Sequence, residues 1–588
     1  MALDRLTILV QQCFAKAGLD ASTVQVEPSH RPDLSQFQCN AALTLAKATR
    51  QPPRAVANAV LPHLAALPEL RDVRVDGPGF INFSMSDAFL TAEVEKLRAD
   101  PRLGSAKEIT AQSILIDYGG PNVAKAMHVG HIRSGIIGDA LERLGKFLGH
   151  QVIGDVHLGD WGLPMGMLIA EIKRRWPHLP YFDPDFPDSF PDEPPVGVDE
   201  LNELYPQAAA RCAEDEDALK EARLATARLQ QGDPGYRALW QSFVNASVTA
   251  IREEFDLLGV GFDLWYGESR VEGRMQPLIE SLEQRGIAER DEGALVIKVA
   301  RDTDNKPMPP LILEKGDGGV TYAATDLATI GARVEEVDPD LLLYVVDQRQ
   351  HLHFDQVFRA AEKAGLIRDG RPRCEHIGFG TINGPDGKPF KTRAGGVMRL
   401  KDLVSLAIDA ARERLDEIGL AEDIAPAERE EIANLIGIAT IRFADLSNHR
   451  QSDYIFNLEK FSRFEGKTGP YMCYAAVRAG SILAKAAEQG LSEGELIEPI
   501  SEQARILYLS LLDFGRVVAT AFDKRAPNIL CDHIYDLAQK FNSLYHQHHI
   551  LSEGDPAVRG ALLSLTRLTR DQLRLSLLLL GIRVPARM

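Results

Sequence analysis

Residues 121–144 read PNVAKAMHVGHIRSGIIGDALERL and join a predicted strand to a predicted helix. The apolar run SILID (113–117) before them predicts a short buried strand, and YGGPN forms the turn between. Apolar residues then recur at helical spacing as far as residue 148, and Gly149 is suited to end the helix. QVIGDV after it predicts a second strand. We therefore expect a parallel sheet that binds its ligand beyond the carboxyl ends of the strands.

The two histidines of this segment are candidates for catalysis. If the helix begins near residue 129, His128 and His131 lie three residues apart on one side of its N-terminus, where phosphate is favoured. Their N–H groups could stabilise the negative charge that builds on a phosphate in the transition state. Gly130 leaves room for a flat base, and Lys125 adds a full positive charge. The combination indicates nucleotidyl transfer at an α-phosphate.

Two simpler interpretations of the histidine pair stay open. Isolated histidines near a helix start are commonly surface or core residues without a catalytic role. The pair could also bind zinc, although no third ligand follows at a useful spacing. The complete order of strand, glycine-rich turn, lysine, His-x-Gly-His and helix favours the catalytic interpretation.

Composition limits the class of protein. The chain has 588 residues, 45% hydrophobic and 26% charged, which is typical of a globular protein of several domains. A net charge of −18 argues against unselective coating of nucleic acid, but it leaves a selective RNA partner open. Six cysteines without a CxxC pair predict neither a zinc knuckle nor a disulfide framework. Without an 18-residue apolar run or the layout of a secretion signal, we expect a cytoplasmic protein with no membrane contact.

The chain divides into three predicted domains. Residues 1–107 read as a small α+β domain, and residues 108–405 alternate strands, loops and helices as a Rossmann-type domain does. An insertion at about 171–262 interrupts this second domain, and its acidic, proline-rich part at 181–210 predicts an irregular, solvated loop. Residues 406–588 are predicted to be almost wholly helical.

PNVAKAMHVGHIRS resembles the first signature of class I aminoacyl-tRNA synthetases, in the form carried by arginyl-tRNA synthetases. Further segments resemble that family in the same order along nearly the whole chain, from FQCNAALTLAK and GPGFINF through HLGDWGLPMGMLIA, TYAATDLATI, VVDQRQHLHF and GKTGPYMCYAAVRA to LGIRVPARM. The resemblance implies an α/β class I synthetase fold. Its Rossmann-type, parallel-sheet catalytic domain would stand between a small N-terminal α+β domain that contacts tRNA and an all-α anticodon-binding domain.

The second class I signature departs from the usual pattern, which is Lys-Met-Ser-Lys-Ser. Here the loop reads GKPFKTRAGG, and Thr392 stands where the second lysine would be. The resemblance implies that Lys125 supplies the missing charge. It also implies a catalytic set, which comprises Lys125, His128, His131 and Lys391. The implied ATP-binding set comprises His128, Gly130, His131, Lys388, Lys391 and Arg393. Taken alone, the loop could equally be a glycine- and lysine-rich hairpin.

A pocket for arginine requires carboxylates, because guanidinium keeps its charge at any usable pH. Tyr322 and Asp326 are four residues apart and share one face if their segment is helical, and Glu268 offers a second carboxylate from a loop. Each could instead be a solvated surface residue, and a lysine substrate could also use carboxylates. The resemblance implies that the amino acid is held by Asn122, Glu268, Tyr322, Asp326 and Gln350.

The implied reaction has two steps. The arginine carboxylate attacks the α-phosphorus of ATP, with Mg²⁺ accompanying the nucleotide, and the arginyl group then passes to the terminal 2′-hydroxyl of the tRNA for arginine. Members of the family commonly require bound tRNA for the first step. No side chain of the protein is assigned to the metal. Two rivals stay open, namely a catalytically silent relative that binds tRNA or arginine and a class I ligase for another amino acid.

The C-terminal segment carries the expected RNA contacts. Tyr535, Phe541 and Tyr545 could stack on unpaired anticodon-loop bases, or they could fill the core of a helical bundle. By the same resemblance, the terminal Met588 is assigned to tRNA binding. The tail is locally basic, with arginines at 567, 570, 574, 583 and 587. We expect the protein to be a monomer.

Overall fold

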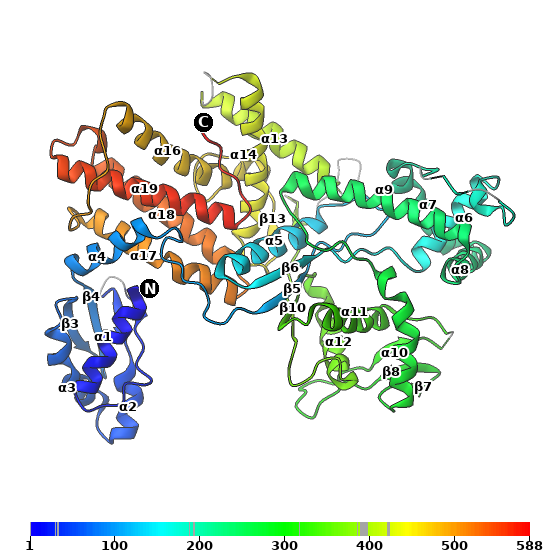
Figure 1. Cartoon of the computed structure of the whole chain (residues 1–588), viewed down its shortest axis with the longest axis horizontal. Coiled ribbons are helices and arrows are strands. Elements are labelled where there is room, and N and C mark those ends of the chain that lie inside the picture. Colours follow the sequence, from blue (N-terminus) through cyan, green and yellow to red (C-terminus); the bar gives the residue numbers. More distant parts are fainter. Residues whose placement is uncertain are drawn as a thin grey trace.

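The computed structural model describes residues 2–29, 31, 35–186, 189–191, 194–316, 318–384, 386–388, 398–419 and 424–588. Figure 1 shows a small α+β unit at the N-terminus, a central parallel sheet, a lobe of helices with a small sheet beside it, and a C-terminal bundle of helices. None of the helices in this part of the chain is both long and apolar enough to span a bilayer.

The central sheet has four parallel strands in the order β11-β10-β5-β6. The predicted strands at 113–117 and after residue 150 are confirmed as β5 (Ser113–Asp117) and β6 (Gln151–Asp155), and the other two are β10 (Leu341–Tyr344) and β11 (Arg373–His376). The chain leaves β5 towards β6, whereas β10 lies on the opposite side of β5. In an open parallel sheet, ligands bind beyond the strand ends at such a switch point.

Helix α5 (Gly130–Leu148) follows the signature segment and is confirmed within two residues of its predicted start. Gly149 ends it with φ of 100°, a left-handed conformation that glycine adopts without strain. The apolar residues that recur along this helix are buried as expected, and the polar side chains of Arg133, Asp139 and Glu142 are buried as well. One face of α5 packs against the central sheet, and helices of the C-terminal bundle cover its other face.

Two buried ion pairs join α5 to α14 (Pro426–Leu446) of the C-terminal bundle. Arg133 Nε lies 2.8 Å from Asp445 Oδ1, and both side chains are at most 1% exposed. Arg442 pairs with Asp139 and also donates from Nε to the Leu580 carbonyl. Each buried charge therefore has its partner on another element, which explains why a helix with charged residues can be covered on both sides.

Replacing Asp139 with alanine is expected to lower the free energy of unfolding by about 3–5 kcal/mol, because the Arg442 guanidinium would remain buried without its counter-charge. The matched control is Arg143→Ala, since Arg143 pairs with the same carboxylate from a position that is 34% exposed. Its loss should cost at most about 1 kcal/mol. Urea unfolding of both variants measures the difference, and equal losses would contradict the assigned importance of the buried pair.

The lobe beside the sheet is built from helices that sequence patterns predicted only in part. Residues 198–210 were predicted to be irregular, but they belong to α7, so that prediction is wrong for this stretch. The Gly197 N–H donates to Glu200 Oε2, and Leu201 and Leu204 are buried one turn apart, which stabilises the start of the helix. The helices of this lobe are α6 (Leu163–Arg175), α7 (Val198–Glu214), α8 (Glu216–Gln230) and α9 (Pro234–Leu258), with the short η1 (Pro180–Phe182).

A second small unit lies between α9 and β10 in the chain. Its antiparallel sheet has the order β7-β8-β9. The helix that follows this sheet, α11, packs with α12 and carries the TYAATD segment. The elements of the unit and its neighbours are η2 (Glu268–Val271), α10 (Glu272–Gln284), β7 (Glu289–Asp291), β8 (Ala294–Ile297), β9 (Leu311–Glu314), α11 (Tyr322–Val337), η3 (Gln348–Gln350) and α12 (His351–Ala364).

The N-terminal unit has a four-stranded antiparallel sheet in the order β1-β2-β4-β3, with helices packed on it. The predicted α+β character of this unit is confirmed, and the Gly-Pro-Gly turn at 77–79 joins β3 to β4. The elements are α1 (Ala2–Lys16), β1 (Glu27–Pro28), β2 (Phe37–Cys39), α2 (Ala41–Thr49), α3 (Pro53–Ala65), β3 (Leu70–Asp76), β4 (Phe80–Met85) and α4 (Asp87–Ala99).

The C-terminal part is helical in nearly all its described residues, as predicted. The exception is β13 (Tyr454–Ile455), which pairs in parallel with β12 (Ile382–Asn383) of the central region. The predicted boundary at residue 405 falls inside α13 (Leu400–Glu417). The remaining helices are α15 (Leu458–Phe461), α16 (Gly469–Glu488), α17 (Glu502–Asp523), α18 (Asn528–Gln547), η4 (Ile550–Ser552) and α19 (Pro556–Leu579).

Candidate functional site

The two signature histidines lie side by side at the start of α5. Their ring centroids are 4.1 Å apart. The Gly130 N–H donates to His128 Nδ1 at 3.0 Å, and the His128 N–H donates to His131 Nδ1 at 3.1 Å. Because both Nδ1 atoms accept, the proton of each neutral ring is carried by Nε2. The backbone hydrogen bonds therefore leave the Nε2–H group of each histidine available to donate to an anion.

Burial and charge keep these histidines neutral. Burial and, to a lesser extent, the charges of His128 and Lys125 lower the pKa of His131 to about 3. The pKa of His128 is also lowered, first by burial and then by the Lys125 ammonium. At pH 7 the two rings can thus donate hydrogen bonds, while the full positive charge beside them belongs to Lys125.

Gly130 has a clear steric role in the structure. A Cβ atom at this position would lie 2.7 Å from His128 Cε1, closer than real contacts allow. The His128 ring therefore occupies the space over Gly130, where the sequence suggested a flat base. Any larger residue at 130 would displace the histidine.

The second signature loop is only partly described. Lys391 and Arg393 lie outside the described residues, as does Thr392. Lys388 is exposed, and its N–H donates to Asp386 Oδ1 at 3.1 Å.

The chain after this loop returns to the first signature. The Val129 N–H donates to the Met398 carbonyl at 3.2 Å, and the Leu400 N–H donates to the Met127 carbonyl at 3.0 Å. The first signature therefore forms a short antiparallel bridge with the residues that directly follow the second signature loop.

A cavity with a volume of about 180 Å³ opens at the carboxyl end of β5, next to the signature segment. Three of the five residues assigned to the amino acid line it, namely Asn122, Glu268 and Asp326. The other two do not: Tyr322 is 65% exposed, and Gln350 is exposed at the end of η3. Burial raises the pKa of Tyr322, and the nearby Glu268 raises it further, so the two side chains lie near each other.

The carboxylates of this cavity crowd one another. Burial, with the nearby charges of Asp160 and Asp326, raises the pKa of Glu268 to about 8. Ser269 fixes the Glu268 loop through its hydroxyl, which donates to Asp160 Oδ2 at 2.6 Å. Asp326 can offer a cationic group one counter-charge, and Glu268 can offer a second once its proton leaves.

His353 orients Asp326, a contact that sequence reasoning missed. Its Nε2 lies 2.6 Å from Asp326 Oδ2. His353 belongs to the HLHF segment at the start of α12, whereas Asp326 belongs to α11. No local spacing pattern predicts this pair, because the two residues come together only when the helices pack.

The floor of the cavity is a buried ion-pair cluster. Arg333 Nη2 lies 2.7 Å from Asp117 Oδ2 and 2.6 Å from Asp155 Oδ2, and the Arg333 side chain is 5% exposed. Burial raises the pKa of Asp117 despite this pairing. The cluster ties the ends of β5 and β6 to α11, which carries Asp326.

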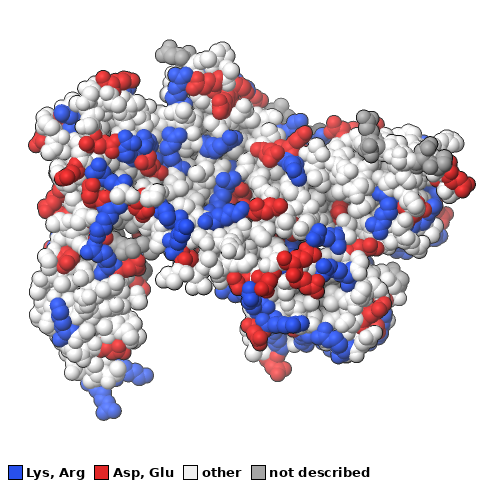
Figure 2. Space-filling model, viewed as in Figure 1, with Lys and Arg blue, Asp and Glu red and all other residues white. Residues whose placement is uncertain are grey.

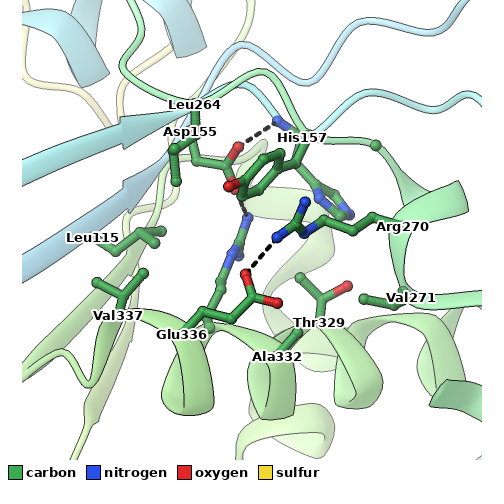
Figure 3. Close-up of a pocket in the computed structure, with 13 residues that line it drawn as sticks. Leu115, Asp155, His157, Leu264, Arg270, Val271, Thr329, Ala332, Glu336 and Val337 are labelled. Atoms are coloured by element: carbon green, nitrogen blue, oxygen red, sulfur yellow. Dashed lines mark hydrogen bonds and ion pairs between the residues drawn. The ribbon is translucent and has the colours of Figure 1, made fainter.

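A second, smaller cavity lies behind this floor (Figure 3). Its volume of about 20 Å³ has room for a single water molecule and excludes an amino acid. Asp155 and His157 lie on one side of it, and Arg270 pairs with Glu336 at 2.7 Å across it. The larger cavity is therefore the candidate site.

The C-terminal residues assigned to RNA differ in exposure. Phe541 is 1% exposed in the core of the bundle, so its predicted stacking on a base is wrong, and the alternative of a core role holds. Tyr535 and Tyr545 are partly buried, and the Arg478 guanidinium lies 4.6 Å from the Tyr545 ring centroid. Met588 is partly buried against the bundle core.

The basic character of the C-terminal tail is reduced by pairing. Arg567 pairs with Glu493, Arg570 with Asp571 and Arg587 with Glu428. Figure 2 shows blue and red groups mixed over the helices of the bundle, with more blue near its middle.

Comparisons with known proteins agree with this architecture. Residues 93–458 match the family "tRNA synthetases class I (R), catalytic domain", residues 472–588 the "DALR anticodon binding domain", and residues 4–85 the "Arginyl tRNA synthetase N terminal domain". Similar relatives include the arginine–tRNA ligases of Maricaulis maris, 46% identical over 100% of this chain and 99% of the relative, and of Hyphomonas neptunium, 47% identical over 98% of each.

Solved structures show the same fold. An arginyl-tRNA synthetase of Plasmodium falciparum matches with a TM-score of 0.79 at 22% identity, over 100% of this chain and 99% of that one. The Thermus thermophilus arginyl-tRNA synthetase matches with a TM-score of 0.78 at 23% identity, over all of both chains. The sequence matches extend from one end of the chain to the other and include all three domain families. The chain belongs to the arginyl-tRNA synthetase family of class I tRNA synthetases.

Proposed function

We propose that this protein joins L-arginine to its cognate tRNA at the expense of ATP, through an enzyme-bound arginyl-adenylate. The observation that carries the proposal is the cavity lined by both Glu268 and Asp326, in which burial and then the nearby charges of Asp160 and Asp326 raise the pKa of Glu268 to about 8. A guanidinium is a planar cation with five donors that pairs with carboxylates in two-point contacts. The full-length relatives named arginine–tRNA ligase support the same substrate.

The proposed roles follow the geometry. Asp326, held by His353, and Glu268 bind the guanidinium, and Asn122 at the cavity rim orients the amino acid. Tyr322 and Gln350 stay assigned to this pocket as residues that would approach the substrate from its exposed side. The carboxylate of arginine then attacks the α-phosphorus of ATP, and His128, His131 and Lys125 stabilise the charge that develops there. Lys388, Lys391 and Arg393 would hold the pyrophosphate.

ATP is the second substrate, and we propose that Mg²⁺ enters with it. Among the described residues, no group of three or more His, Cys, Asp or Glu side chains is arranged to hold a metal ion. The signature histidines use Nδ1 to accept backbone N–H groups, so their remaining donors suit phosphate oxygens. The ion, held by the nucleotide, would neutralise phosphate charge.

A charging assay tests the proposed function. Purified protein with ATP, Mg²⁺ and total tRNA is given each of the twenty amino acids, and we expect only arginine to be esterified to tRNA. Absence of any product would favour a silent relative that binds arginine or tRNA, and the intact signature from Lys125 to His131 argues against that alternative. A different charged amino acid would favour a class I ligase of other specificity.

Arginine binding is expected to strengthen as pH rises. Below about pH 8 the Glu268 carboxyl holds a proton, and binding a guanidinium requires that proton to leave. The Kd for arginine should therefore fall about tenfold between pH 7 and pH 9 and then level off. Isothermal titration calorimetry in buffers of different ionisation enthalpy measures both the Kd and the released proton. In Glu268→Gln the dependence should vanish, and a pH-independent Kd in the unsubstituted protein would contradict the role of Glu268.

The remaining proposals concern tRNA binding, the oligomeric state and the cellular compartment of the protein. The C-terminal bundle would read the anticodon loop, with Tyr535, Tyr545 and Met588 as contact candidates. The transfer step would use the terminal 2′-hydroxyl of the tRNA. We also propose that the protein acts as a monomer in the cytoplasm, and sedimentation of the free protein tests its oligomeric state.

A further inference from the structure

We propose that helices α7 and α9 of the lobe beside the sheet position Lys125, and that Tyr205 is the residue that holds its ammonium group. This inference rests on the proposed function, because it concerns the step in which Lys125 stabilises phosphate charge. Lys125 lies in the signature segment, whereas Tyr205 lies on α7, eighty positions further along the chain. Neither the resemblance nor the sequence pattern assigns a role to Tyr205.

The segment before Lys125 is built into the core of this lobe. Val123 and Ala124 are 0% and 1% exposed, and they belong to the same apolar cluster as Leu204 on α7 and Phe243 on α9. The Trp240 indole on α9 donates to the Asp160 carbonyl at 2.7 Å. The lobe thus fixes both the signature segment and the loop next to Glu268.

Ala124 gives the segment an unusual backbone conformation. Its φ is 61°, in the left-handed region that residues with a Cβ rarely adopt. The Ala124 N–H donates to Ser247 Oγ on α9 at 3.0 Å, and the Val123 N–H donates to the Gly159 carbonyl at 3.0 Å. These contacts stabilise the conformation that directs the next residue, Lys125.

The ammonium of Lys125 then meets an aromatic face. Its Nζ lies 4.3 Å from the centroid of the Tyr205 ring, within the range of a cation–π interaction. Tyr205 is also close to Tyr322, whose pKa it helps to raise, so it stands between the signature segment and the mouth of the arginine pocket. Among the described residues, no carboxylate forms an ion pair with Lys125 that would compete for its charge.

An aromatic partner is suited to this task. A carboxylate would neutralise Lys125, but a tyrosine ring restricts its position while leaving the full charge available to phosphate. Because Thr392 stands where the other signature usually has its second lysine, the resemblance assigns the charge of that lysine to Lys125, and the position of the Lys125 ammonium becomes important for the step. Restricting a lysine side chain before the reaction lowers the entropy lost when it contacts the developing charge.

The test is a double-mutant cycle between Tyr205 and Lys125. Single-turnover formation of arginyl-adenylate is measured with saturating ATP, arginine and tRNA, after the unsubstituted protein has been shown to charge tRNA with arginine. Tyr205→Leu is expected to slow the step about 5- to 30-fold with little change in the KM for arginine. In the Lys125→Met background the same substitution should change the rate less than about twofold.

Two variants separate the aromatic ring from other effects. Tyr205→Phe keeps the ring and should restore most of the rate lost in Tyr205→Leu. Leu224→Ala, at a side chain that is 66% exposed on the same lobe, controls for a general disturbance and should behave as the unsubstituted protein. Equal losses from Tyr205→Leu in both backgrounds, or a Tyr205→Phe variant as slow as Tyr205→Leu, would overturn the proposal. A protein that does not charge tRNA with arginine would instead refute the proposed function.

Discussion

The Asp326→Ala variant should bind arginine at least about thirtyfold more weakly, because truncating one partner of a buried, hydrogen-bonded charge pair costs about 2–5 kcal/mol. Asp326 lines the cavity, and His353 holds its carboxylate at 2.6 Å. In the variant, the substrate guanidinium would lose one of its two counter-charges. The neighbouring Glu268, with a pKa raised to about 8, would offer only a fraction of a charge at pH 7.

Steady-state charging kinetics measure this effect as the KM for arginine at saturating tRNA. The KM for ATP should change little, because the nucleotide is assigned to the histidine side of the site. Asp326→Asn is the matched control for shape, since it keeps a hydrogen-bonding group near His353 but removes the charge. An arginine KM within about threefold of that of the unsubstituted protein would exclude Asp326 from the guanidinium site.

Lys125→Met should slow adenylate formation about 10²- to 10³-fold, the usual cost of removing one preorganised group that stabilises transition-state charge. Lys125 is the full positive charge beside His128 and His131, which are neutral at pH 7. The loss should be found in kcat, because the charge on the α-phosphate develops only as the reaction proceeds.

The effect of Lys125→Met on tRNA affinity is compared with its effect on the rate of adenylate formation. Filter binding of labelled tRNA should give nearly the same Kd for Lys125→Met and the unsubstituted protein. Lys125→Arg, which keeps the charge but changes its shape, should recover part of the rate. Equal losses in tRNA affinity and in adenylate formation would contradict a role at the phosphate.

Local patterns predicted the elements that carry the chemistry. The strand at 113–117, the start of α5 and its end at Gly149 follow from apolar spacing and from the conformational preference of glycine, which act between residues near in sequence. Tyr322 and Asp326 were expected to share one face only on the condition that their segment is helical, and α11 meets that condition. The order of the motifs along the chain was sufficient to indicate the family.

Contacts between distant segments were not predictable in this way. The buried polar face of α5 depends on charges supplied by α14, more than three hundred residues away. Phe541 looked suited to stacking on a base, but the bundle buries it. Helix α7 begins inside a stretch whose composition indicates an irregular loop, because packing of Leu201 and Leu204 outweighs local propensity.

The order of residues along the chain specifies which side chains are available for reaction, namely two histidines and a lysine before a helix and acidic residues on later segments. Which of these side chains come into contact depends on the packing of distant elements. That packing set His353 against Asp326, brought Tyr205 to Lys125, and left Tyr322 and Gln350 outside the cavity. The reason is physical: periodicity and capping act within a few residues, whereas burial, charge pairing and aromatic contact depend on how whole elements pack.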